Sequence, residues 1–123
     1  MTDAHTAKVL DTAIEIIGEC GWYAGEAIGP AGEVCASEAI DRAAFRLMDV
    51  GPPDGTPVTS AARASAARRA ELAGVAAELA VIAAAGYSPD LPGGIQFWND
   101  ILCEDQDEAV CTMRAAAAAA QAP

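Results

Sequence analysis

The feature that most constrains the fold is a turn-rich stretch at residues 21–40, which holds one of the two tryptophans. Two short runs flank Gly29-Pro30-Ala31-Gly32, where glycine permits positive φ and proline presets φ for a turn. The pattern predicts a short β-hairpin near residues 22–36, followed by a helix from Ser37. Two strands alone are marginally stable in water, so this hairpin needs helices to pack against. We expect Trp22 to anchor it in their core.

The rest of the chain is typical of helices, because apolar residues recur at spacings of three and four. Roughly a quarter of the residues are alanine, which raises helix propensity more than it adds buried area. We expect helices over about 6–19, 37–49, 60–85 and 105–120, and a short helical turn at 95–101.

One of these helices decides how the domain packs. Leu72, Val75, Leu79 and Ile82 alternate at spacings of three and four, and this stripe is expected to pack against the first helix. The predicted fold class is therefore mainly α (α+β): a small four- to five-helix domain with one short β-hairpin. It is expected to form a single domain over 1–123, with an alanine tail that frays from about residue 115.

The net charge of −11, from 18 acidic and 7 basic residues, restricts the partners. Nucleic-acid backbones and anionic membranes repel such a chain, so direct binding to either is not expected. Solubility is the simplest role for the charge. A DNA mimic that occupies the basic site of a nucleic-acid-binding protein is the sharper alternative, and it predicts a double row of carboxylates.

Targeting signals and cofactor motifs do not stand out. The N-terminus lacks the basic and apolar regions of a secretory signal, and no apolar run is long enough for a bilayer. The four cysteines form no zinc-like pair, and reduced thiols in the cytoplasm are the favoured interpretation. A disulfide between Cys20 and Cys35 is a minor alternative. We predict no metal and no cofactor.

Two segments together resemble a known family. The pattern is Gly-Trp-x-x-Gly from Gly21, Gly-Glu-Val-Cys-Ala from Gly32, and Trp-Asn-Asp from Trp98, followed by an alanine-rich helix from Asp105. It resembles a family of small proteins of actinobacteria and their phages that is catalogued as a domain of unknown function. The resemblance spans about residues 9–118, and it implies a source and a fold but no activity.

Three groups of residues are candidates for chemistry. Trp98-Asn99-Asp100 offers an aromatic wall, an amide and a carboxylate, although a buried Trp98 with Asn99 and Asp100 bonded to the backbone is the favoured interpretation. Five carboxylates suit a hard cation but lack EF-hand spacing, and a variant capping box of Asp105 and Glu108 at the start of a helix explains two of them. Cys35 would need His5 as its base. The five carboxylates are Asp100, Glu104, Asp105, Asp107 and Glu108.

These observations favour a non-enzymatic cytoplasmic protein that acts through contacts with an unknown protein partner, as a phage accessory or host-modulating factor. A thiol- or metal-dependent enzyme is a further alternative, and a homo-oligomer stays open. Apolar residues that a small core cannot bury would mark the binding surface. The candidate protein-binding rim comprises Trp22, Tyr23, Glu26, Ile28, Trp98, Asn99 and Asp100.

Overall fold

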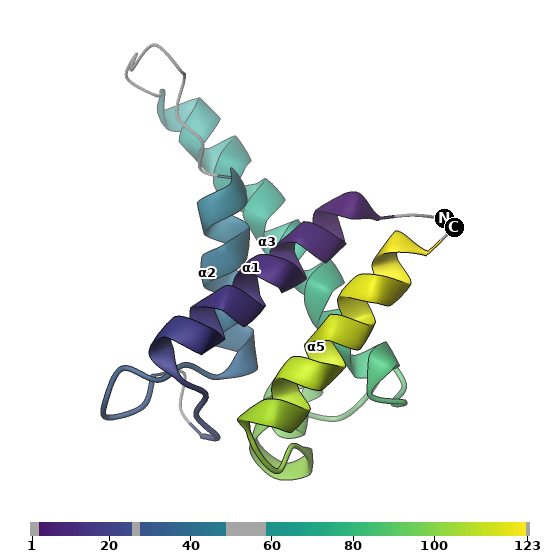
Figure 1. Ribbon diagram of the computed structural model, residues 1–123. Helices are drawn as coiled ribbons and strands as arrows, with labels where there is room; N and C mark the ends of the chain where they lie inside the picture. The colour runs from purple at the N-terminus through teal and green to yellow at the C-terminus, as the bar shows by residue number, and fades with distance from the viewer. Residues whose placement is uncertain (1–2, 26–27, 49–58, 123) are drawn as a thin grey trace.

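The computed structural model describes residues 3–25, 28–48 and 59–122 and is a bundle of helices (Figure 1). Helix α1 crosses the front of the bundle beside α5, and the long α3 runs behind both. The elements are α1 (Ala4–Cys20), α2 (Ala36–Met48), α3 (Ser60–Ala84), α4 (Gly94–Phe97), the π-helix η1 (Trp98–Leu102) and α5 (Gln106–Gln121).

The helix starts follow from local capping chemistry. The side chains of Asp3, Thr59 and Asp105 each accept a backbone N–H from the first turn of α1, α3 and α5. These bonds satisfy donors that have no partner inside the helix. At the other end of α1, Gly21 adopts φ 87° and its N–H donates to Ile17, a conformation that glycine allows without strain. The bounds of the observed helices agree with the predicted ranges to within a few residues.

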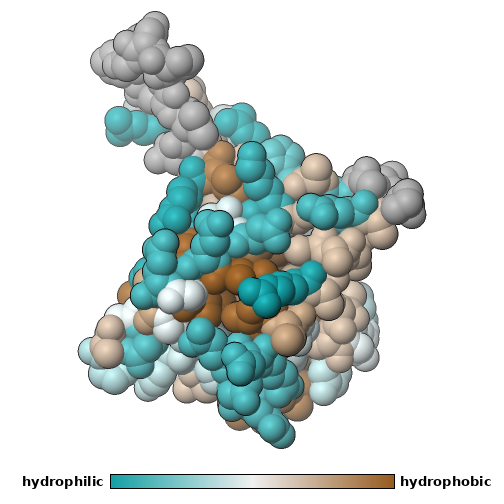
Figure 2. All heavy atoms as spheres, in the orientation of Figure 1, coloured by the Kyte–Doolittle hydropathy of each residue, from teal (hydrophilic) through white to brown (hydrophobic). Residues whose placement is uncertain are grey.

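The core lies where α1 meets α2, α3 and α5. From α1 it takes Val9, Leu10, Ala13, Ile16 and Ile17, all at most 1% exposed. On the face shown in Figure 2, hydrophobic atoms lie between α1 and α5, with hydrophilic atoms on most sides and the tan of alanine on the side of α5. The large aromatic in the core is Trp98, which is 2% exposed. Trp22, which we expected to fill that place, is only partly buried.

The alanine run at the end of the chain is part of this packing. Helix α5 continues through it to Gln121, and Ala116 and Ala117 are buried. The N–H of Asp3 donates to the carbonyl of Ala120 over 2.6 Å. This bond places the start of α1 beside the end of α5 (Figure 1). Fraying of this run in solution stays a prediction.

The predicted β-hairpin is not confirmed in the described residues of 21–36. They form two isolated bridges, a parallel one between Trp22 and Val34 and an antiparallel one between Ile28 and Val34. Side chains from residues 96–106 form hydrogen bonds with the main-chain N–H and carbonyl groups of residues 22–25, which limits strand pairing there. Groups engaged in this way are not available to a strand ladder.

Candidate functional site

The most connected polar side chain is that of Asn99, which is fully buried. Its Oδ1 accepts from Trp22 Nε1 over 2.6 Å and from the N–H of Ala36 over 2.9 Å. Its Nδ2 donates to the Tyr23 carbonyl over 3.1 Å and to Asp100 Oδ1 over 2.9 Å. The amide thus uses both donors and both acceptor positions. We call these five residues the Asn99 hub.

A second set of bonds extends the hub along the loop. The N–H of Gly25 donates to Asp100 Oδ1 over 2.9 Å. Gln96 lies one turn before Asp100, and its Nε2 donates both to the Gly25 carbonyl and to the Asp100 carboxylate. Both backbone polar groups of Gly25 are therefore bonded by side chains from the α4–η1 segment.

The π-helix η1 presents these side chains. The N–H of Cys103 bonds the carbonyl of Trp98 five residues earlier, which makes a wider turn than in an α-helix. Trp98 and Asn99 are neighbours in the sequence, yet both are buried, Trp98 among apolar residues and Asn99 under the loop. The Trp-Asn-Asp motif therefore has a structural role: Asn99 and Asp100 hydrogen-bond the 22–36 loop to the bundle.

The residues of the candidate protein-binding rim differ in their exposure. Trp98 and Asn99 are buried, whereas Trp22, Tyr23 and Asp100 are partly exposed and bonded within the hub. Ile28 is exposed, and Glu26 lies outside the described residues. The structure brings most of the predicted residues together. A binding role for the rim stays a prediction.

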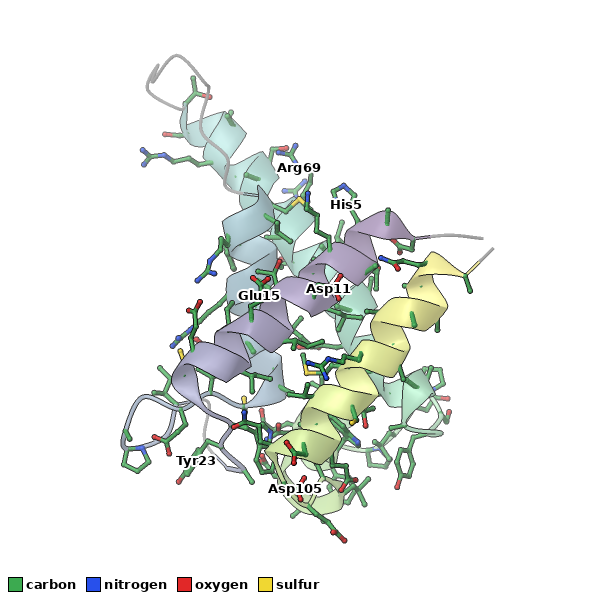
Figure 3. The ribbon with its side chains drawn as sticks, in the orientation of Figure 1. His5, Asp11, Glu15, Tyr23, Arg69 and Asp105 are labelled. Atoms are coloured by element: carbon green, nitrogen blue, oxygen red, sulfur yellow. The ribbon has the colours of Figure 1, made fainter. Side chains whose placement is uncertain are left out.

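Cys35 sits beside the hub as a buried free thiol. Its sulfur accepts the N–H of Glu38 over 3.4 Å, and it lies 3.9 Å from Gln96 Oε1. Burial raises the pKa of this thiol, which disfavours the thiolate that a nucleophile needs. His5, its proposed base, lies at the end of the molecule opposite Tyr23 (Figure 3). The structure does not bring the cysteine and the histidine together.

Cys20 and Cys103 are also free thiols in the structure. The disulfide alternative between Cys20 and Cys35 is therefore not formed. Burial, together with the nearby Glu108 carboxylate, raises the pKa of Cys103 to about 11.

The carboxylates near residues 100–108 have structural partners. Asp105 Oδ1 accepts the N–H of Glu108 over 2.8 Å, and Glu108 Oε2 accepts the N–H of Glu104 over 3.1 Å. This exchange resembles a capping box, as the sequence predicted. Within the described ranges, no group of three His, Cys, Asp or Glu side chains is placed to hold a metal ion.

A separate polar contact joins α2 to α3. Ser37 Oγ donates to Glu78 Oε1 over 3.1 Å. Burial raises the pKa of Glu78, and the nearby Asp41 adds to the shift. The pKa of Asp41 is raised by burial and then by Glu38. Glu38 itself forms an ion pair with Arg42, at 2.9 Å.

The exposed acids of α1 bear on the DNA-mimic alternative. Asp11, Glu15 and Glu19 are exposed and follow one another at successive turns. Figure 3 shows Asp11 and Glu15 along the front of this helix. They form one row of carboxylates, whereas the alternative predicted a double row.

The outer face of α3 differs from the prediction. Leu72, Val75 and Leu79 are 65%, 52% and 42% exposed, and Ile82 alone of the predicted stripe is buried. The inner face, which packs on the bundle, carries smaller residues: Ala70, Gly74, Ala77 and Val81. Small residues bring the helices close, and a Cβ on Gly74 would lie 3.5 Å from Asp41 Oδ1. The predicted packing of the Leu72 stripe on α1 is therefore wrong.

An open groove of about 510 Å³ adjoins this outer face. Alanines form most of its walls, and residues at the start of α1 line it as well. The lining residues are Ala76, Leu79, Ala80, Ala83 and Ala84 of α3, Ala116, Ala119 and Ala120 of α5, and Asp3 and Thr6. Across residues 72–85 and 115–122, which flank the groove, Glu78 is the single charged residue. Figure 2 shows the tan of alanine along the C-terminal half of α5.

The other end of the outer face is basic. Arg63, Arg68 and Arg69 are exposed on the N-terminal half of α3. Arg69 and Leu72 line a second groove, of about 300 Å³, together with His5. Figure 3 shows Arg69 and His5 at the same end of the bundle. The sequence pattern indicates the leucines but predicts them in the core. The signal for their exposure is that α3 carries apolar residues on both faces.

A comparison with curated proteins and a comparison with solved structures each gave no match. None of the helices within the described ranges is long and apolar enough to cross a membrane. Residues 1–119 match the model of one protein family, which spans the hub, the outer face of α3 and most of α5. The expected resemblance to a domain of unknown function is confirmed, and the chain belongs to the Family of unknown function (DUF6197).

Proposed function

We propose that this protein acts by binding a protein partner and that the outer face of α3 is the contact surface. The observation that carries the proposal is the exposure of Leu72, Val75 and Leu79 on successive turns of one helix. A helix that is apolar on all sides is normally buried on all sides. Helix α3 is covered on its inner face, so its outer face is suited to a partner.

The exposed side chains of this surface supply part of the energy that binding needs. Burying a fully exposed Val or Leu side chain contributes about 1.5–3 kcal/mol. The three side chains are about half exposed on average, so their burial would contribute roughly 3 kcal/mol in total before the alanines of the groove are counted. Fixing the partner opposes this gain. A specific contact is expected to extend over the groove as well.

Catalysis has less support than binding. The amide of Asn99 is fully bonded, and Asp100 accepts bonds from Gly25, Gln96 and Asn99. The pKa of Cys35 is raised, which opposes nucleophilic use. A non-enzymatic role is therefore our proposal. A phage accessory or host-modulating role, a cytoplasmic location and an actinobacterial or phage source stay predictions.

Site-specific photo-crosslinking tests this proposal. The crosslinker p-benzoylphenylalanine would replace Leu79 on the outer face or, as a matched control, Ile101, an apolar residue of η1 that is 67% exposed. We expect one discrete crosslinked species from position 79 in cells that naturally carry the gene, and none from position 101. Val75→Glu in the same chain should abolish that species. The absence of a crosslink at position 79, or equal crosslinking at both positions, would refute the proposal.

A further inference from the structure

We propose that the partner at the outer face of α3 is a second copy of this chain, with the two α3 helices antiparallel about a twofold axis beside Val75 and Ala76. The inference rests on the proposed function, because it assigns an occupant to the same face. Three properties of the face support it: its charge, its shape and the polarity of α3.

Charge restricts where two copies can meet. Each copy carries a net charge of −11, so most approaches bring carboxylates together. Residues 72–84 of α3 contain a single charged residue, Glu78, and its carboxylate is turned toward Ser37 of α2. Glu71 is exposed just before this range, and in the antiparallel pair it faces Ala80 of the second copy and no acid. Contact through the outer face therefore lets two acidic chains approach without apposing their acids.

The shape of the face is self-complementary. A twofold interface uses the same patch on both copies, so the patch has to provide both the protruding side chains and the space that receives them. Leu72 and Val75 protrude, and the alanine-lined groove of about 510 Å³ lies alongside, beginning at Ala76. With the axis beside Val75 and Ala76, Leu72 of each copy lies against the end of the partner's groove at Leu79.

Helix polarity selects the antiparallel orientation. The last turn of α3 has no basic residue, so the partial negative charge of its final carbonyls is not offset within the helix. At 1.5 Å per residue, Arg69 lies about 10 Å from the axis on one side, and Ile82 about 10 Å on the other. An antiparallel pair places Arg68 and Arg69 beside the partner's last turn. A parallel pair would place these arginines against one another.

The size of the face predicts a reversible dimer. Stable interfaces cover about 800 Å² per partner, about a tenth of a small protein's surface. A tenth of this chain's 7012 Å² is about 700 Å². The proposed face is confined to half of α3 and the edge of the groove, so we expect a dimer that forms and dissociates with concentration.

Sedimentation and light scattering across a concentration series test the pairing. From about 10 to 500 µM in 0.15 M salt, the mass should rise from 12.5 kDa toward twice that value. Val75→Glu, which places two carboxylates at the axis, should hold the mass at 12.5 kDa, and circular dichroism should show unchanged helix. Ile101→Glu is the matched control and should dimerise as the parent does. A parent that stays monomeric throughout, or a Val75→Glu variant that dimerises normally, would overturn the inference.

A charge pair tests the orientation. Leu72→Arg and Leu79→Glu should each weaken the dimer at least tenfold. Combined in one chain, they should restore it, because the antiparallel pair places position 72 opposite the partner's position 79. In a parallel pair like charges would meet, and the double variant would stay monomeric, which would overturn the antiparallel arrangement.

The outcomes separate this inference from the proposed function. A monomeric chain whose position 79 crosslinks to a different protein would refute self-pairing and leave the binding role intact. A chain that neither dimerises nor crosslinks at position 79 would refute both. A crosslinked species of twice the chain mass would support both.

Discussion

The Asn99 hub and the outer face of α3 reverse the usual distribution of polar and apolar groups. The hub buries an amide completely, while α3 leaves two leucines and a valine in water. Burial of the amide is tolerable because each of its polar atoms has a partner. Exposure of the leucines has no such compensation in the single chain. The comparison separates a region whose interactions are complete from one that gains by contact with a partner.

The largest expected effect is that of Asn99→Ala. The substitution leaves Trp22 Nε1, the N–H of Ala36 and the Tyr23 carbonyl without their partner, which should lower the free energy of unfolding by about 3 kcal/mol. Urea denaturation measures it. Gln106→Ala is the control, since it removes one bond to the N–H of Trp22 and should cost about 1 kcal/mol. Equal losses in the two variants would show that Asn99 is not a hub.

Trp22→Phe should have a smaller effect. It removes the indole N–H and leaves Asn99 Oδ1 with a single donor, Ala36, at an expected cost of about 1.5 kcal/mol. The melting temperature should fall by roughly 5 °C. Tyr87→Phe, which removes a polar group from an aromatic residue that is 40% exposed, should leave it unchanged. An unchanged melting temperature for Trp22→Phe would mean that water replaces the indole in the hub.

Glu78 lies between the two regions and should show the next effect, which depends on pH. Because burial raises its pKa in the folded state, the folded protein binds the proton more tightly than the unfolded chain. This contribution to stability is present in acid and is lost as the pH rises through the raised pKa. Asp41 acts in the same direction.

Glu78→Gln should therefore stabilise the protein slightly at pH 7 and flatten the dependence of its melting temperature on pH above 4.5, the ordinary value for glutamate. The amide oxygen can still accept from Ser37. Glu71→Gln, on the exposed side of the same helix, should leave the pH dependence intact. A steeper dependence in Glu78→Gln would contradict the assignment.

The smallest effect should come from Val75→Thr at low protein concentration. The side chain is 52% exposed, so a hydroxyl there meets water, and the change should stay within about 0.5 kcal/mol. The same substitution at Val81, which is fully buried, should cost about 1–2 kcal/mol. Thermal melts of both variants measure the difference. Equal costs would mean that the two faces of α3 are not distinct.

Much of the fold could be predicted because helices are specified locally. Periodicity placed each long helix, and short-range chemistry identified Asp105 as a cap. The hairpin failed because the groups that engage its backbone lie about 75 residues away, on Gln96, Asn99 and Asp100. Local turn chemistry carries no information about such distant partners.

The candidate site was predicted in part for the same reason. Trp98-Asn99-Asp100 was recognised as a motif, and its bonds to the backbone agree with the structural interpretation. The outer face of α3 was misplaced because size suggested that the leucines face inward. Close helix packing instead favoured Gly74 and Ala77 on the inner face. Periodicity shows that a helix has an apolar stripe, but not which of two stripes is covered.

The long reach of the Asn99 bonds has a consequence for the order of folding. They join residues 63 to 77 positions apart, so closing them requires a large loop to be ordered first. Helices and their nearest contacts form on shorter timescales. The hub should therefore assemble after the folding barrier has been crossed. Substitutions at Asn99 should then accelerate unfolding and leave the refolding rate nearly unchanged. The bonds of the hub would therefore set the unfolding rate, and with it the lifetime of the native state.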